Sequence, residues 1–208
     1  MELNPHDLLR IQGMEDLYSG CPFPDWVRVA LVKAPYVVVR RAEHIIDGVP
    51  VGIRGAERGQ RFAAWLHPDK ILEVITPGSL INPAHWKIAY PFTMPATIQT
   101  LTLIAPVMQM TGYGWGPTGS SGFELATGIS SIKDTSDLDL VIHLPEKITK
   151  QQGSSLLEQL EKLSLVGLDI QMNTPAGGVA IREYILAEQV LVKTSTAPVL
   201  QDANCLWS

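Results

Sequence analysis

Apolar residues alternate with two aspartates between residues 136 and 143, and this alternation is the clearest pattern in the chain. In the run SDLDLVIH, Asp137 and Asp139 face one side of an extended strand while leucines and an isoleucine face the other. Two like charges on one face of a half-buried strand repel each other, so packing alone does not require them. The pattern therefore predicts a strand whose aspartates take part in catalysis or metal binding, with a solvated strand face or a loop as the alternative interpretation.

Two other segments repeat apolar residues at the spacing of a helix. Residues 96–110 predict a buried helix, formed on Ile98, Leu101, Leu103, Ile104 and Met108. Residues 150–166 predict an amphipathic helix, formed on Leu156, Leu157, Leu160, Leu163 and Leu165. The run GLDIQM then predicts a strand in which Asp169 is flanked by apolar residues, and residues 180–194 predict a helix followed by a strand.

The first part of the chain is rich in β-branched residues. Residues 6–11 predict a short helix or turn, and residues 24–43 predict two strands separated by Ala34-Pro35. Residues 49–66 predict a strand that turns at two glycines into a helix carrying Phe62, Ala63 and Leu66.

A cluster of helix and strand breakers separates the two halves of the chain. Residues 77–97 contain Pro77, Gly78, Pro83, Pro91 and Pro95. We therefore expect a smaller α+β domain over residues 1–86 and a second domain over residues 87–208. The second domain mixes strands and helices without regular alternation, so the predicted fold class is α+β, with helices flanking a mixed sheet.

The composition excludes several classes of protein. Of the 208 residues, 46% are hydrophobic and 18% are charged, as in an ordinary globular protein. A net charge of −5 argues against a nucleic-acid partner, because such proteins present a basic surface. The two cysteines have no zinc-ligand spacing. The N-terminus has no signal-peptide pattern and no run is long enough to span a membrane, so a cytoplasmic protein without a membrane partner is expected.

The three aspartates and a Gly-Ser turn predict a phosphate-handling site. If their strands are neighbours, Asp137, Asp139 and Asp169 converge and can act as catalytic residues and ligands of Mg²⁺ or Mn²⁺. Gly119, Ser120 and Ser121 precede them in a turn whose backbone N–H groups suit phosphate. Asp169 is expected to act either as a ligand or as a proton acceptor for the attacking hydroxyl.

This arrangement resembles the nucleotidyltransferase superfamily, whose signature is a Gly-Ser turn, two aspartates alternating with apolar residues, and a later flanked aspartate. Here these are Gly119-Ser120, the pair around Leu138, and Leu168-Asp169-Ile170. The sixteen residues between Ser120 and Asp137 exceed the usual spacing. The resemblance implies a nucleotidyltransferase-like fold for the C-terminal domain.

Several separated motifs narrow the resemblance to one family. PHDLLRI, VPVGIRGAERGQRFAAWL, WGPTGSSGFELATG with SDLDLVI, and LDIQMNTPAGGVAIREY are similar to the phosphoribosyl-dephospho-CoA transferase of malonate decarboxylase, its holo-[acyl-carrier-protein] synthase. The resemblance implies transfer of 2′-(5-phosphoribosyl)-3′-dephospho-CoA from its triphosphoribosyl precursor to a serine of the apo acyl-carrier subunit, with release of pyrophosphate. Two alternatives remain open: the same chemistry with another nucleotide donor, and a non-catalytic assembly module on this fold.

Arginines in the first domain are candidates for contacts with the donor. Arg54, Arg58 and Arg61 fall at the spacing of one helix face and could clamp its phosphates, or simply form a solvated basic face. Arg40 and Arg41 could belong to the same patch or to a surface that docks the carrier.

Two further residues, Trp115 and Glu124, have two interpretations each. Trp115 could stack on the adenine of the donor or belong to the core, and Glu124 could reach the site or cap a helix. His6 and His143 have no ligand spacing and fit packing roles.

Overall fold

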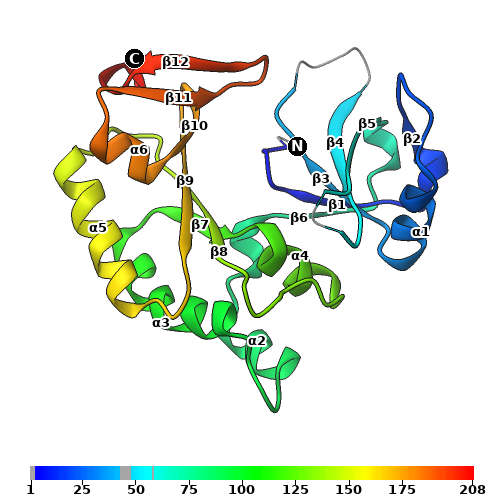
Figure 1. The fold of residues 1–208 in the computed structure, drawn as a ribbon, viewed down its shortest axis with the longest axis horizontal. Coiled ribbons are helices and arrows are strands. Elements are labelled where there is room, and N and C mark those ends of the chain that lie inside the picture. Colours follow the sequence, from blue (N-terminus) through cyan, green and yellow to red (C-terminus); the bar gives the residue numbers. More distant parts are fainter. Residues whose placement is uncertain (1–2, 43–47, 58) are drawn as a thin grey trace. The chain divides into compact units, whose positions relative to one another are not determined.

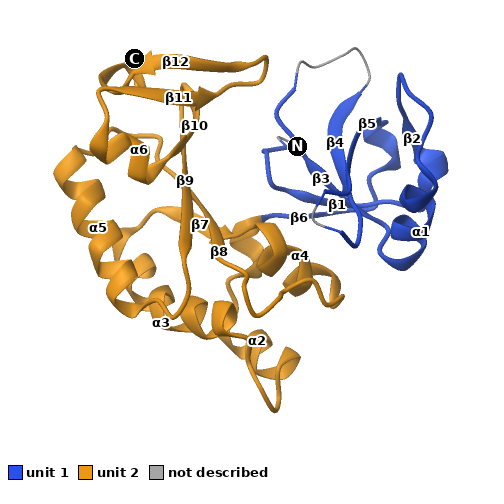
Figure 2. Ribbon diagram, viewed as in Figure 1, with its two compact units in different colours: residues 1–76 blue, residues 77–208 orange. Residues whose placement is uncertain are grey.

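The computed structural model describes residues 3–42, 48–57 and 59–208 (Figure 1). The chain divides into two compact units, residues 1–76 and residues 77–208 (Figure 2). The described residues form six α-helices and two six-stranded sheets, one sheet in each unit. Both units mix helices with strands, which confirms the α+β class. None of the helices in the described part of the chain is long and apolar enough to cross a membrane.

The boundary between the units lies ten residues before the predicted one, because the segment after residue 76 packs on the second unit. The backbone carbonyl oxygen of Pro77 approaches Gly116 so closely that a Cβ there would lie 2.1 Å from it. The buried Trp86 donates its indole N–H to the carbonyl oxygen of Leu80 at 2.9 Å. Proline-rich sequence therefore marks a well-packed segment here rather than a linker.

The described residues of the N-terminal unit form an antiparallel sheet with one α-helix. Its strands are β1 (Leu8–Arg10), β2 (Leu17–Tyr18), β3 (Tyr36–Val39), β4 (Val49–Arg54), β5 (Arg61–Leu66) and β6 (Glu73–Ile75). They lie in the order β2-β5-β4-β3-β1-β6, and helix α1 (Asp25–Lys33) contacts β4. Short 3₁₀ turns cover Met14–Asp16 and Pro68–Lys70.

Three predictions for this unit are wrong, and tertiary packing explains them. Residues 25–33 form α1 rather than a strand, because Val27 and Leu31, four residues apart, are both buried in the core. Residues 61–66 form β5 rather than a helix, because Phe62, Ala64 and Leu66 alternate toward the same core while the strand pairs with β4. Residues 8–10 form β1, preceded by a turn, where a short helix or turn was predicted.

The C-terminal unit is a mixed sheet with five helices among its described residues. Its strands are β7 (Gly114–Pro117), β8 (Leu138–His143), β9 (Leu168–Thr174), β10 (Gly177–Ala180), β11 (Gln189–Lys193) and β12 (Pro198–Asp202). Its helices are α2 (Pro83–Ala89), α3 (Ala96–Thr111), α4 (Gly119–Thr127), α5 (Lys150–Leu163) and α6 (Ile181–Leu186), with 3₁₀ turns at Pro77–Leu80 and Ala203–Cys205. The strand order is β12-β11-β10-β9-β8-β7.

Strands β8 and β9 are parallel and are joined through helix α5, whereas the other pairs described in this sheet are antiparallel. The helices predicted over residues 96–110 and 150–166 are confirmed as α3 and α5, and the helix and strand predicted after residue 180 as α6 and β11. Helix α5 ends at Leu163, however, so Leu165 lies outside it and is 58% exposed. Leu103 departs from the predicted buried face of α3, since it is 45% exposed.

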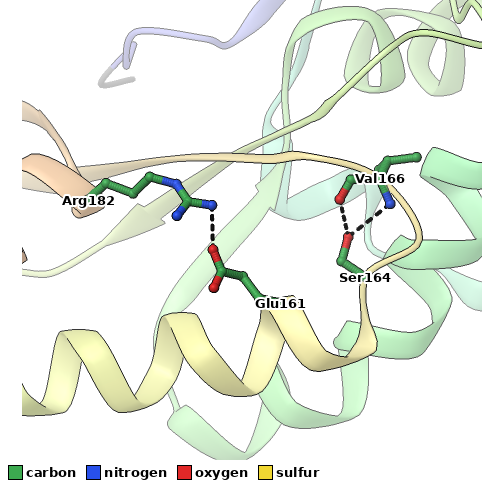
Figure 3. A network of polar contacts seen from close by, with 4 residues as sticks. All are labelled: Glu161, Ser164, Val166 and Arg182. Carbon is green, nitrogen blue, oxygen red and sulfur yellow. Dashed lines mark hydrogen bonds and ion pairs between the residues drawn. The ribbon is translucent and has the colours of Figure 1, made fainter.

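Polar contacts fix the C-terminal end of helix α5, which leads into β9 (Figure 3). Glu161 forms an ion pair with Arg182 of α6. The Ser164 hydroxyl donates to the carbonyl oxygen of Val166 at 2.6 Å and accepts the N–H of the same residue at 3.3 Å. The chain therefore enters β9 through a closed turn, and this fixes where Asp169 lies.

Candidate active site

The three candidate aspartates lie at the starts of two adjacent strands. Asp139 of β8 and Asp169 of β9 are Cα partners in the parallel register. Residues paired in this way point to the same face of a sheet, and neighbouring strands are about 4.8 Å apart, so the two side chains are neighbours. Asp139 is half-buried and Asp169 is exposed. The structure thus brings together two residues that are thirty positions apart in the sequence.

Asp137 immediately precedes β8 and leans toward β9. The N–H of Leu138 donates to the carbonyl oxygen of Gly167 at 2.8 Å, which continues the pairing of the strands beyond β8. A Cβ at Gly167 would lie 2.4 Å from Oδ1 of Asp137, so a glycine there leaves room for this carboxylate. Asp137 is two residues before Asp139, so extended backbone places both on one face.

The carboxylate of Asp139 lies against the first residue of α4. Gly119 has a φ of 58°, and a Cβ at this position would lie 1.8 Å from Oδ2 of Asp139. A backbone hydrogen bond joins the same two segments, since the N–H of Thr118 donates to the carbonyl oxygen of Asp139 at 2.9 Å. The Gly-Ser turn and the aspartate strand are therefore in direct contact, despite the long segment between them.

The two serines of this turn lie inside the first turn of α4. Ser120 is 8% exposed and Ser121 only 1%, and the Oγ of Ser121 has no hydrogen-bond partner among the described residues. The first N–H groups of a helix have no partner within the helix and carry its positive dipole end. This end of α4 therefore attracts an anion, with Asp139 beside it.

The site offers oxygen ligands suited to a hard divalent cation. Within residues 3–42, 48–57 and 59–208, no three His, Cys, Asp or Glu side chains are gathered as a ready-made metal cage. Mg²⁺ does not need one, because one or two carboxylates together with substrate phosphates usually hold it. A phosphate at the start of α4 would meet the negative charge of Asp139, and a cation between them removes that repulsion. The residues present therefore fit Mg²⁺ or Mn²⁺.

Glu124 has a structural role that the sequence did not indicate. Its Oε2 accepts the N–H groups of Ser131 at 2.6 Å and Ile132 at 2.7 Å, and its Oε1 accepts the hydroxyl of Tyr90 at 2.8 Å. Burial, with the hydrogen bond to Glu124 and the charge of its carboxylate, raises the pKa of Tyr90 well above its usual range. Tyr90 therefore stays protonated and keeps donating. Glu124 neither caps its own helix nor stands free to bind a metal.

Arg54 and Arg61 lie on the two strands of a hairpin and not on a helix, which corrects the prediction. Arg54 of β4 and Arg61 of β5 are Cα partners, so their side chains project from the same face of that sheet. Arg58 lies outside the described residues. Arg40 packs over the ring of Trp65, 5.5 Å from its centroid, and its Nε donates to the carbonyl oxygen of Val51.

Three aromatic or imidazole candidates are placed by packing. Trp115 is 5% exposed in β7 and pairs with Ile142, so it belongs to the core and cannot stack on an adenine in this conformation. His143 ends β8, at the opposite end of the strand from the aspartates. His6 adopts a left-handed φ of 80° in the turn before β1, and its N–H donates to the carbonyl oxygen of Val39.

Comparisons with known proteins agree over almost the whole chain. Residues 4–77 match the family model of the phosphoribosyl-dephospho-CoA transferase MdcG N-terminal domain, and residues 86–204 match that of its C-terminal domain. A relative named phosphoribosyl-dephospho-CoA transferase from Pseudomonas putida (strain GB-1) is 39% identical, with 94% of this chain and 92% of the relative covered.

Two other bacteria contain similar proteins with the same name. The relative from Azotobacter vinelandii is 35% identical, with 92% of this chain and 89% of the relative covered. The relative from Klebsiella pneumoniae is 34% identical, with 92% and 90% covered. No solved structure matches the chain significantly.

Proposed function

Because this chain belongs to the phosphoribosyl-dephospho-CoA transferase family, we propose that it attaches the phosphoribosyl-dephospho-CoA group to a serine of an acyl-carrier protein. The donor is 2′-(5-triphosphoribosyl)-3′-dephospho-CoA, the acceptor is the apo acyl-carrier subunit of malonate decarboxylase, and pyrophosphate is released. The observation that supports this most is the contact between Asp139 of β8 and the first turn of α4, with Asp169 beside Asp139 on β9. It offers carboxylates and helix N–H groups at one place.

The proposed reaction is one displacement at phosphorus. The serine oxygen of the carrier attacks the phosphate next to the ribose, and a new P–O bond forms. The bond from that phosphorus to the pyrophosphate oxygen breaks, and the serine proton passes to a base. Asp169, whose side chain is exposed, would either accept this proton or act as a metal ligand.

The chain contributes positioning and charge to this step. The N–H groups at Gly119, Ser120 and Ser121 hold the leaving pyrophosphate at the start of α4. Asp137 and Asp139 would hold Mg²⁺ or Mn²⁺, with Asp169 completing the set. A bound divalent cation would neutralise negative charge that develops on the phosphates. Oriented groups of this kind usually supply most of the rate in phosphoryl transfer.

An intact-mass assay tests this proposal directly. The protein is mixed with the apo carrier subunit, the triphosphoribosyl donor and Mg²⁺, and the mass of the carrier is followed. A mass increase equal to the donor minus pyrophosphate is the expected result. Pyrophosphate release only with ATP or another nucleotide would replace the donor while keeping the chemistry. No turnover with any donor would favour a non-catalytic assembly module.

The hairpin of β4 and β5, which carries Arg54 and Arg61, gives a second prediction. If Arg61 contacts the phosphates of the donor, Arg61→Gln should raise the KM for the donor about 10-fold with little change in kcat, because it removes binding common to substrate and transition state. Arg10→Gln is the matched control, since Arg10 lies on the same sheet and pairs with Glu73 at 2.9 Å. Equal KM values for the two variants would show that Arg61 is only part of a solvated basic face.

A further inference from the structure

The segment between α4 and β8 runs back along the helix toward its first turn. Helix α4 ends at Thr127 and is capped by Gly128, whose N–H donates to the carbonyl oxygen of Glu124 and whose φ is 70°. Three residues later, the hydroxyl of Ser131 donates to the carbonyl oxygen of Ser120 at 2.8 Å. Ser120 belongs to the first turn, so the chain has reversed direction. We call residues 129–136 the return segment.

Two sets of hydrogen bonds hold the return segment in place. Glu124 accepts the N–H groups of Ser131 and Ile132, and such bonds to a charged acceptor are stronger than those between neutral groups. The next residues form a closed turn, in which Lys133 donates its N–H to Oγ of Ser136 at 2.9 Å and accepts the N–H of Ser136 at 2.9 Å. The backbone of Lys133 is therefore fixed from both sides.

These bonds place the backbone of Lys133 near the candidate phosphate site. Lys133 is two residues after Ser131, so their Cα atoms are at most about 7 Å apart. Its side chain is exposed, and its ammonium group makes no salt bridge with any residue that the structure describes. A long, flexible stem on a fixed backbone can carry this charge to an anion at the first turn of α4.

The negative charge around the site indicates a function for the positive side chain of Lys133. Asp137, Asp139 and Asp169 are all negative, and a triphosphate donor adds more negative charge at the same place. We propose that Lys133 binds the phosphates of the donor, and that Glu124 is a positioning residue that fixes Lys133 for this contact. This inference rests on the proposed function and adds to it a phosphate ligand that comes from the catalytic unit itself.

Binding of inorganic pyrophosphate in the presence of Mg²⁺, measured by calorimetry, tests the inference without turnover. Lys133→Gln should weaken this binding about 10-fold and raise the KM for the donor similarly, while kcat changes little. Lys133→Arg should restore most of the affinity, because the charge is kept. Lys162→Gln, at an exposed position of α5, is the control and should bind like the unchanged protein.

Glu124→Gln tests the positioning role. It should speed hydrogen exchange at the N–H groups of Ser131 and Ile132 and weaken pyrophosphate binding, with thermal unfolding recorded to show that the variant folds. In the double variant that combines Glu124→Gln with Lys133→Gln, the loss of binding free energy for pyrophosphate should be much smaller than the sum of the two single losses. Both changes remove the same contact. Additive losses would overturn the positioning role.

Two further outcomes separate this inference from the function on which it rests. If the unchanged protein binds pyrophosphate and Lys133→Gln binds it equally well, Lys133 is not a phosphate ligand, whatever the reaction. If the unchanged protein does not bind pyrophosphate at all, the proposed function fails and the inference fails with it.

Discussion

Replacing Asp139 by asparagine is expected to lower the rate of transfer about 100-fold or more, the usual loss when a preorganised charged group is removed from an active site. Asp139 is in contact with the first turn of α4 and is paired with Asp169, so its charge is central to the site. Asparagine has nearly the same shape, so the strand should persist. The rate of carrier modification and the affinity for Mn²⁺, measured by titration, should fall together.

Asp69→Asn provides the matched control for this change. Asp69 is exposed on a 3₁₀ turn of the N-terminal unit, and its loss should leave both the rate and the metal affinity unchanged. Full activity of Asp139→Asn would remove this carboxylate from the mechanism. Loss of activity with unchanged Mn²⁺ affinity would keep its catalytic role but reject its role as a metal ligand.

Replacing Gly119 by alanine is expected to lower the rate of transfer about as much as Asp139→Asn does, and also to destabilise the protein. A side chain at a φ of 58° costs about 1–2 kcal/mol, and the new methyl group would overlap the carboxylate of Asp139. The first turn of α4 and the aspartate must therefore move apart. Thermal unfolding and the transfer assay measure the two effects separately.

Gly128→Ala distinguishes the two causes. Gly128 has a similar φ of 70° at the other end of α4, but nothing lies within 4 Å of the added Cβ. This variant should lose about 1 kcal/mol of stability and keep its activity. If both glycine variants kept full activity, close contact between the turn and Asp139 would not matter for the reaction.

The sequence predicted those parts of the catalytic unit that have strong periodic patterns. Helices α3 and α5 were recognised because they bury one apolar face, and β8 and β9 because aspartates alternate with apolar residues. Strand β8 begins at Leu138, so Asp137 immediately precedes it. The contact between Gly119 and Asp139 required the fold, because helix α4 and the return segment separate them in the sequence.

The wrong predictions concern segments in which the local preference for a helix or a strand disagrees with tertiary packing. Valines in α1 favour a strand by propensity, yet Val29 and Val32 point to solvent on a helix whose other face is buried. Arg54 and Arg61 fit a helix face equally well, although they are partners across a hairpin. The bonds of Glu124 to the backbone of Ser131 and Ile132 had no sequence signal, because any surface glutamate on a helix looks the same.

The parallel pairing of β8 and β9 has a consequence for the order of events during folding. Among the described strands, this is the one parallel pair, and its partners are separated by the whole of α5. Closing a connection of that length is entropically costly and slow compared with forming a helix or a hairpin. During refolding, helical content should return first, and the aspartates should become neighbours only in a later phase.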